Sequence, residues 1–469
     1  MVFSSLTFLF LFLPLVLLLY FILPGIRAKN ILLLVASLLF YAWGEPVYVF
    51  LMVATALINW ACGLLMERGH KGLWCTLAVV FDLGCLVVFK YTGFLVENLN
   101  ALFSLSLPVP QIALPIGISF YTFQILSYVV DVKRGSVAVQ RSFARFLLYV
   151  TLFPQLIAGP IVRYSDVEAE LTNRTVDAQS VFYGLYRFCV GLGKKVLLAD
   201  YAGSAASKIL DGTLAAQTTL GMWFGVLMFM FEIYFDFSGY SDMAIGMGRM
   251  FGFKYPENFR LPYTARSITD FWRRWHISLS TFFRDYVYIP LGGNRRHVYL
   301  NLAIVWTLTG LWHGASWNFV LWGVYFLVLL VLERLLRKPI EHIPRLLRHA
   351  GTLLLILIGW NIFYYTDTSR LLESFRVLFG ASGVGFTDHQ TSILMLNSMP
   401  LAVLCAICCT PLPRILGASL SVLCATDGHI GFRQYLFSIG MYVISIALFV
   451  ISVISLTGSS FNAFLYFRF

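Results

Sequence analysis

The chain has 469 residues, of which 59% are hydrophobic and only 12% are charged, and its mean hydropathy is +0.78. A soluble core cannot absorb that much apolar surface, so the composition excludes a soluble globular protein and predicts an all-α polytopic membrane protein. The formal net charge of +11 does not indicate nucleic-acid binding, because the basic residues lie in short loops between apolar segments, as the positive-inside rule requires.

Five apolar segments in the first 130 residues are candidates for membrane spans. They are residues 6–23, 30–44, 47–66, 73–89 and 113–130. The first lacks a basic leader and a small-residue cleavage site, so we expect a retained span and not a signal peptide. Basic loops follow the first, third and fifth spans, which predicts an extracytoplasmic N-terminus and cytoplasmic loops at these three places.

The regular pattern of spans breaks after residue 145. Residues 146–162 are apolar but interrupted by Pro154, which predicts a re-entrant or kinked element buried in protein. Residues 180–198 carry three basic side chains and suit a tilted or interfacial helix. A further span at 219–234 runs into the stretch FDFSGYSDMAIG at 235–246, which is rich in Gly, Ser and Asp.

Residues 253–300 differ from the rest of the chain in being both basic and aromatic. The charged side chains in this segment are Lys254, Arg260, Arg266, Arg273, Arg274, Arg284, Arg295 and Arg296 against Glu257, Asp270 and Asp285. This composition suits a cytoplasmic segment at the entrance for an anionic donor with a flat ring, such as a nucleotide-bearing cofactor. A cytoplasmic face that rests on anionic lipid explains the same composition, and both interpretations remain open.

Residues 298–332 contain no Asp, Glu, Lys or Arg, and the one titratable side chain near the centre of this stretch is His313. An ionisable residue at membrane depth is a functional hypothesis, and an imidazole can move protons near neutral pH. A histidine that only bonds a neighbouring carbonyl remains an alternative. The flanking Trp312, Gly314 and Trp317 favour a shaped site, because small and planar residues let a ligand approach closely.

Three more spans are predicted at 350–366, 394–409 and 435–456. The CxxCC cluster formed by Cys405, Cys408 and Cys409 lies in an apolar span without histidine, so we interpret it as small hydrophobic side chains and not as a metal site. The total is eleven to thirteen transmembrane or re-entrant helices. The loop charges place the C-terminus outside as well, so the number of full crossings is even, and we expect twelve.

Four motifs carry a resemblance to a known family. They are FPQLIAGP at 153–160, YFDFSGYSDMAIG at 234–246, SITDFWRRWHISLSTFFRDYVYIPLGG at 267–293 and GLWHGASWNFVLWG at 310–323. Together they resemble the membrane-bound O-acyltransferase family, in the branch of alginate and peptidoglycan O-acetylation and teichoic-acid D-alanylation.

The resemblance covers nearly the whole chain and implies a single membrane domain, 1–469, with helices around a central pore. Its parts would be N-terminal spans (1–130), a core (131–434) and a last span with its tail (435–469).

The resemblance implies that His313 is the catalytic histidine and His276 the second polar position of the active site. The residues themselves agree, because acyl transfer from a thioester needs a base near the attacking hydroxyl, and no metal is required. Trp312, Trp317 and Asn318 are candidate donors to the oxyanion.

The basic segment supplies two further candidates. Arg273 and Arg274 would help bind the donor. Asp285 could orient a partner, but we favour a structural ion pair between it and Arg284.

The resemblance also implies the substrates and partners. The donor would be cytoplasmic acetyl-CoA, with no bound cofactor, and the acceptor an alginate-like exopolysaccharide or peptidoglycan outside the bacterial cytoplasmic membrane. An extracytoplasmic esterase-like (SGNH-type) partner would complete the transfer, and we expect a separate protein because no such domain is present in the sequence. The alternative is a proton-coupled transporter of a lipid-linked or polysaccharide substrate that uses His313 as a relay.

The tail SSFNAFLYFRF is similar to the aromatic C-terminal motif of the small companion protein in teichoic-acid D-alanylation. This resemblance suggests that Tyr466 accepts the acyl group as an ester and passes it to the external partner. The alternative is an aromatic anchor in the headgroup belt.

Overall fold

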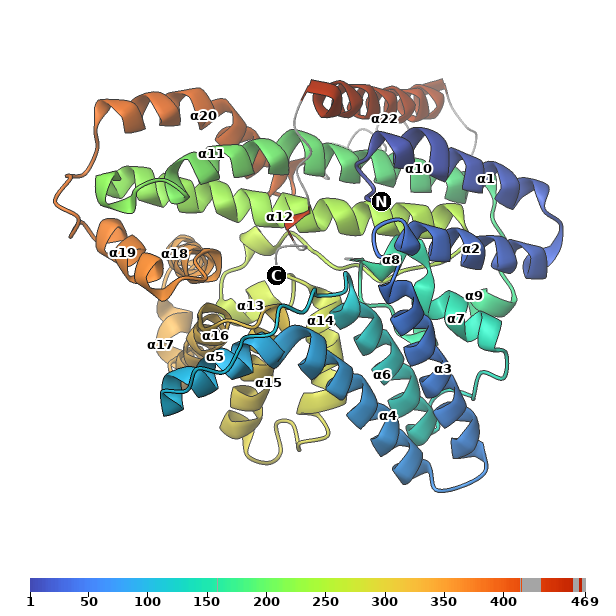
Figure 1. The fold of residues 1–469 in the computed structure, drawn as a ribbon. Coiled ribbons are helices and arrows are strands. Elements are labelled where there is room, and N and C mark those ends of the chain that lie inside the picture. Colours follow the sequence, from blue (N-terminus) through green and yellow to red (C-terminus); the bar gives the residue numbers. More distant parts are fainter. Residues whose placement is uncertain (158, 414, 416–431, 459–463, 466–469) are drawn as a thin grey trace. The chain divides into compact units, whose positions relative to one another are not determined.

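The computed structural model describes residues 1–157, 159–413, 415, 432–458, 464 and 465, with backbone alone for 432–438. All the regular structure in this part of the chain is helical, which confirms the all-α prediction (Figure 1). The chain divides into two compact units, which are described separately. The first comprises Met1–Phe188, Ser241–Glu257 and Thr281–Leu291, and the second comprises Cys189–Tyr240, Asn258–Ser280 and Gly292–Phe469.

The first unit begins with the predicted N-terminal spans. Its helices are η1 (Phe8–Phe12), α1 (Leu13–Ile22), α2 (Gly25–Ala42), α3 (Tyr48–Glu67), α4 (Lys71–Leu86), η2 (Val87–Tyr91), α5 (Thr92–Phe103) and α6 (Ile118–Arg134). The fourth span was predicted too short, because α4, η2 and α5 form one helix that continues to Phe103. The fifth begins later than predicted, because Pro115 disfavours helix before it and Gly117 enters with φ of +76°.

The broken element after residue 145 is confirmed. It consists of α7 (Phe143–Thr151) and the short α8 (Phe153–Leu156), followed by α9 (Tyr164–Thr172). The backbone N–H of Phe153, which opens α8 at the break, donates to Ser37 Oγ at 3.1 Å. The break is tolerated because its backbone is buried and hydrogen-bonded inside the protein.

A long helical stretch follows, made of α10 (Ala178–Gly193), η3 (Lys194–Ala199) and α11 (Asp200–Leu210), and then η4 (Leu214–Ala216) and α12 (Thr219–Met250). Contrary to the predicted end of the span at residue 234, α12 continues through the Gly-rich motif. A Cβ at Gly239 would lie 2.7 Å from the carbonyl oxygen of Gly191. The small residues therefore permit close packing of α12 on α10 and do not end the helix.

The basic and aromatic segment 253–300 forms short elements and turns as far as residue 297, where α15 follows. The elements are η5 (Pro262–Thr264), α13 (Ile268–Trp272), α14 (Ile277–Phe283) and η6 (Arg284–Tyr288). The ion pair predicted for Asp285 is present, with Arg284 Nε at 2.6 Å, and Arg163 adds a second contact at 2.9 Å. Asp285 is therefore a structural residue of the first unit.

The apolar stretch 298–332 contains a turn. It forms two packed helices, α15 (Val298–His313) and α16 (Trp317–Leu335), joined by a short turn. A Cβ at Gly310 or Gly323 would collide with the backbone of the opposite helix, so glycine permits the close approach. His313 therefore lies at the end of a helix in a hairpin.

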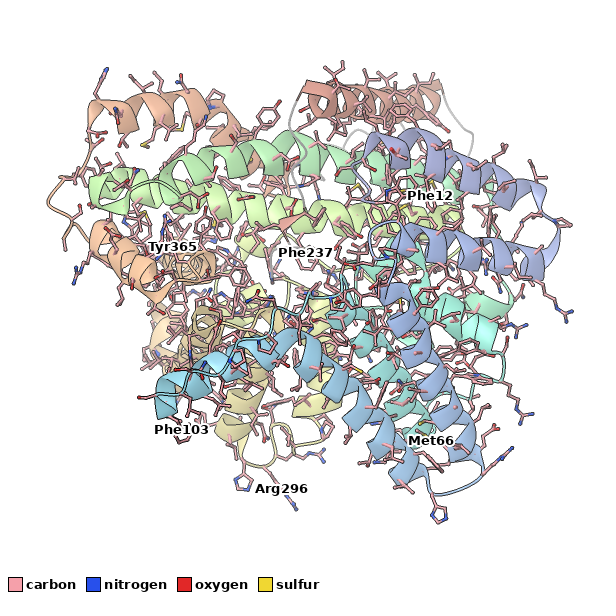
Figure 2. All side chains as sticks on the ribbon, viewed as in Figure 1. Phe12, Met66, Phe103, Phe237, Arg296 and Tyr365 are labelled. Carbon is pink, nitrogen blue, oxygen red and sulfur yellow. The ribbon has the colours of Figure 1, made fainter. Side chains whose placement is uncertain are left out.

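The remaining helices belong to the second unit: α17 (Arg337–His342), α18 (Arg345–Tyr364), α19 (Thr368–Leu378), α20 (His389–Cys408) and α22 (Phe432–Gly458). Eight helices of the described chain are long and apolar enough to cross a membrane, and a shorter apolar helix spans Phe8–Ile22. Large apolar side chains cover their outer surfaces, for example Phe103 at the end of α5 (Figure 2). The chain is thus a multi-pass membrane protein.

Candidate active site

The first predicted histidine lies in the turn that connects α13 to α14 in the second unit. His276 is 1% exposed and has a left-handed backbone, with φ of +43°. Its Nδ1 lies 3.1 Å from Asn258 Oδ1, which also accepts from Ser278 Oγ at 2.9 Å. The Asn258 carbonyl oxygen receives the N–H of Ile277 at 2.9 Å. Non-glycine residues in this backbone region are rare and concentrate at functional sites.

These hydrogen bonds determine the state of the His276 ring. Because Asn258 Oδ1 can only accept, the bond assigns the proton to Nδ1 and the lone pair to Nε2. Burial lowers the pKa of His276 to about 3. The imidazole is therefore neutral at physiological pH, which is the form that can accept a proton.

The second predicted histidine ends α15 and is enclosed by aromatic rings. His313 is 7% exposed. The edges and faces of three rings meet its imidazole nearly at right angles, with centroid distances of 4.9 Å to Trp312, 5.0 Å to Trp322 and 5.2 Å to Phe363. This enclosure holds the imidazole in an apolar site at the C-terminal end of the helix.

Trp312 brings the two histidines into one site. Its ring lies 5.7 Å from the ring of His276 as well as beside His313. The ring of Phe237, from α12, also contacts the His276 ring, with the two centroids 4.7 Å apart. The structure therefore places both predicted catalytic histidines and Trp312 in a single buried cluster of the second unit.

The other predicted binding residues are placed less uniformly. Asn318 is buried, and its Nδ2 donates to the carbonyl oxygen of Phe363 at 3.1 Å, so it holds the end of α18 beside His313. Trp317 is 54% exposed at the start of α16. Arg273 is exposed, while Arg274 Nε pairs with Asp270 at 2.8 Å. Tyr466 lies outside the described residues.

Several residues at the site were not predicted. Asn258 fixes the tautomer of His276, and Trp322 and Phe363 complete the enclosure of His313. Trp322 is fully buried, and no described residue accepts a hydrogen bond from its indole Nε1–H. A buried donor in this state is costly and often marks a functional site. Trp322 stands in the quoted motif at 310–323, but the hairpin that turns it toward His313 is a tertiary feature.

Residues 77–372 match the model of the MBOAT, membrane-bound O-acyltransferase, family. The chain belongs to the membrane-bound O-acyltransferase family. It is 40% identical to a probable alginate O-acetylase of Azotobacter vinelandii over the full length of both chains. It is 35% identical to a peptidoglycan O-acetyltransferase of Helicobacter pylori over 82% of this chain and 81% of that one.

More distant is a teichoic acid D-alanyltransferase of Bacillus subtilis, which is 30% identical over 48% of this chain and 60% of that one. The family and these relatives identify the protein as an acyltransferase of the membrane-bound O-acyltransferase family, as its motifs indicated. The histidine cluster lies within the part of the chain that the family model matches.

Proposed function

We propose that this acyltransferase takes an acetyl group from cytoplasmic acetyl-CoA for the O-acetylation of an alginate-like exopolysaccharide outside the bacterial cytoplasmic membrane. The observation that carries the proposal is that the imidazoles of His276 and His313 both contact the ring of Trp312. The chain is also similar over its whole length to a probable alginate O-acetylase. The same pair of imidazoles supports acyl chemistry over proton-coupled transport, because the chain belongs to an acyltransferase family and acyl transfer from a thioester needs a base near the attacking hydroxyl.

In the proposed reaction His313 removes the proton from the attacking hydroxyl, whose oxygen forms a bond to the thioester carbonyl carbon. The tetrahedral intermediate then breaks its carbon–sulfur bond, and the protonated imidazole returns the proton to the departing thiolate. His276, held neutral with its proton on Nδ1, keeps the lone pair of Nε2 as a hydrogen-bond acceptor in the cluster. Donor binding is assigned to Arg273 and Arg274, as predicted from the basic segment.

The oxyanion of the intermediate needs hydrogen-bond donors in a dry environment. The indoles of Trp312 and Trp322 both contact the His313 ring, and both are buried. Trp322 is a candidate because its N–H has no acceptor among the described residues and would gain one in the intermediate. This assignment replaces Trp317, whose ring is half exposed.

We further propose that Tyr466 carries the acetyl group as an ester between the membrane site and an SGNH-type esterase-like partner. Division of the transfer into two covalent steps is a general strategy of acyl transfer. The tail leads to Tyr466 through Phe464 and Leu465, which are buried in the unit that holds both histidines. A tyrosine ester on the C-terminal peptide after incubation with acetyl-CoA would support this step, and normal glycan acetylation by a Tyr466→Phe variant would contradict it.

A second acceptor, peptidoglycan, is favoured by the 35% identity to the peptidoglycan O-acetyltransferase of Helicobacter pylori. The experiment supplies isotope-labelled acetyl-CoA to membranes that contain the full chain, its external partner and either acceptor. Mass spectrometry of the recovered glycan then locates the label. We expect label on uronic-acid hydroxyls, lost in a His313→Ala variant. Label on peptidoglycan alone would assign the second acceptor, and export of unlabelled polymer without acetylation would overturn the enzymatic proposal.

A further inference from the structure

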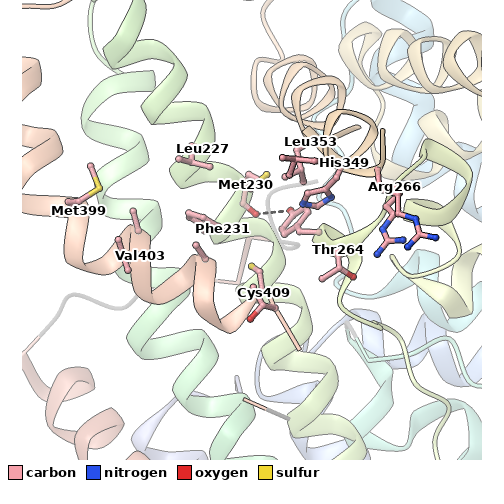
Figure 3. Close-up of a pocket in the computed structure, with 16 residues that line it drawn as sticks. Leu227, Met230, Phe231, Thr264, Arg266, His349, Leu353, Met399, Val403 and Cys409 are labelled. Atoms are coloured by element: carbon pink, nitrogen blue, oxygen red, sulfur yellow. Dashed lines mark hydrogen bonds between the residues drawn. The ribbon is translucent and has the colours of Figure 1, made fainter. Parts of the chain in front are cut away.

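A cleft of about 750 Å³ lies in the second unit between α12, α18 and α20, and none of the residues of the histidine cluster lines it (Figure 3). Its walls are apolar over most of their length, with Leu227 and Phe231 from α12 and Met399 and Val403 from α20. On the other side in Figure 3 the lining includes Thr264, Arg266 and His349. The cleft is thus amphipathic along its length.

The basic side of the cleft is built by two neighbouring segments. His349 Nδ1 of α18 lies 2.8 Å from the carbonyl oxygen of Ala265, which holds the loop that carries Arg266 against the helix. Arg345 adds a second guanidinium from the first turn of α18. Both arginines are exposed, and no carboxylate of the described chain forms an ion pair with either. The two cations are therefore available to an anionic ligand.

The direction of the cleft agrees with the predicted topology. Its basic side lies at the start of α18 and near Cys409 at the end of α20, which the positive-inside rule places on the cytoplasmic side. From there the apolar walls extend along α20 to Met399. A ligand that fits has an anionic head at the inner headgroup level and a hydrocarbon chain that points into the bilayer.

We propose that this cleft binds an anionic glycerophospholipid of the cytoplasmic leaflet, with its phosphate between Arg266 and Arg345 and one acyl chain along α12 and α20. Basic pockets between membrane helices on this side recognise such headgroups, and the apolar groove accounts for the chain. Lipid bound here would brace α18, whose far end holds Phe363 beside His313.

The test is native mass spectrometry of the full chain in detergent during titration with dioleoyl phosphatidylglycerol or dioleoyl phosphatidylcholine. We expect phosphatidylglycerol to bind preferentially, and an Arg266→Gln/Arg345→Gln variant to lose about tenfold or more of that affinity. An Arg337→Gln/Lys338→Gln variant changes two basic residues that do not line the cleft, so it should bind as the wild type does.

The apolar part of the cleft has its own pair of variants. Ala406→Trp would fill the groove and should weaken both lipids, whereas Leu404→Trp lies on the same helix outside the lining and should weaken neither. Equal binding of the two lipids, unchanged by the arginine substitutions, would overturn the proposal. So would displacement of phosphatidylglycerol by acetyl-CoA, because the cations would then belong to the donor site.

A second, independent observation concerns a buried charge cluster that the mechanism does not use. Lys195 of η3 is 3% exposed, and its Nζ lies 2.7 Å from both Asp200 Oδ1 and Asp236 Oδ1. The other oxygen of Asp236 accepts the backbone N–H of Leu465 at 2.8 Å. The C-terminal tail therefore donates a backbone hydrogen bond to the buried carboxylate of Asp236, which lies in the middle of α12.

Ring contacts hold the preceding tail residue at the same place. Phe464 is 3% exposed, its ring stands edge-on to Tyr240 with centroids 4.4 Å apart, and Lys195 Nζ lies 5.1 Å from its centroid. The residue after Asp236 is Phe237, which contacts the His276 ring. The tail is thus attached to α12 at Asp236, one residue before Phe237, whose ring contacts His276.

We infer that Asp236 and Lys195 are positioning residues that form a dock for the C-terminal tail and set where residues beyond Leu465 begin. Any role of this dock in acetyl transfer rests on the proposed function of Tyr466. The existence of the dock does not depend on that proposal. A hydrogen bond from a backbone N–H to a buried carboxylate is strong. A single substitution that removes this N–H should therefore release the tail from the dock.

The test leaves the buried cluster intact and changes only the tail. A Phe464→Cys variant is combined with Leu465→Pro, which removes the N–H, or with Leu465→Ala, which keeps it. In native membranes we expect the thiol at position 464 to react with a maleimide about tenfold or more faster in the proline variant. Equal rates would overturn the dock. Because labelling needs no acetyl-CoA or acceptor, this failure is distinct from a failure of the proposed enzymatic function.

Discussion

At the residue scale, the site depends on how two imidazoles are held. Asn258 fixes the proton of His276 on Nδ1, and three aromatic rings enclose His313. The rings around His313 fix the position of its imidazole, and the Asn258 hydrogen bond fixes the orientation of the His276 ring. The local surroundings therefore fix the position and orientation of both histidines.

The first prediction concerns His313 as the base. His313→Ala should lower the turnover number for acetyl transfer about 10²–10⁴-fold, which is the usual loss when a general base is removed. The measurement is release of coenzyme A thiol by the variant at saturating acetyl-CoA and acceptor. His342→Ala changes an exposed histidine of α17 and should leave turnover unchanged. More than half of wild-type turnover in His313→Ala would refute the assignment.

The second prediction concerns the indole N–H of Trp322. Trp322→Phe keeps a ring beside His313 and removes the donor, so turnover should fall about 10²–10³-fold while the KM for acetyl-CoA changes little. Trp360→Phe is the matched control, because Trp360 is equally buried and its ring packs on Trp322. An equal loss in both variants would mean that packing, and not the donor, is responsible.

At the element scale, short helices in the segment 253–300 place its histidine and arginine side chains on different sides. The turn between α13 and α14 presents His276 inward, while Arg273 stays on the exposed side of the same turn. Arg274 pairs with Asp270 one helical turn earlier, so its charge is partly compensated. The two arginines predicted to bind the donor are therefore not equivalent, and Arg273 is the cleaner probe.

The third prediction follows from this difference. Arg273→Glu should raise the KM for acetyl-CoA several-fold at low ionic strength, and the effect should fade above about 0.15 M salt because exposed charges are screened. Initial rates measured across a salt series test it. Arg337→Glu, in exposed α17, should show no such change. A KM for Arg273→Glu that matches the wild type at every salt concentration would remove Arg273 from the donor entrance.

At the scale of the whole molecule, topology decides which side meets the donor. The basic loops predict that residues 253–300 and the start of α18 are cytoplasmic, and that Asp367 before α19 lies outside. This orientation is what a cytoplasmic donor and an external acceptor require. It is also the orientation that the lipid cleft requires, so one measurement bears on both proposals.

The fourth prediction tests this orientation. In intact cells, a thiol introduced by Asn294→Cys should resist a membrane-impermeant maleimide until the membrane is opened, whereas Asp367→Cys should react from outside. Peptide mass spectrometry separates the new thiols from the native ones. External labelling of Asn294→Cys would reverse the topology and remove the donor role of the basic segment.

The sequence by itself determined the class of the protein and most of its spans. Hydropathy and loop charge are local properties, so they identify α2, α3, α18 and α20 to within a few residues. The motifs were sufficient to indicate the family and to select His276 and His313, since these residues stand in specific, contiguous blocks of the chain.

Tertiary structure alone decided how those residues meet. Gly314 and Ser316 mark the turn after His313 locally, but the hairpin also depends on Gly310 and Gly323, which permit the close contact between the facing helices. The hydrogen bond from His276 to Asn258 spans 18 residues, and the contact of Leu465 with Asp236 spans 229. Such contacts depend on which surfaces pack together, and packing is a property of the folded chain that no periodicity in the sequence records.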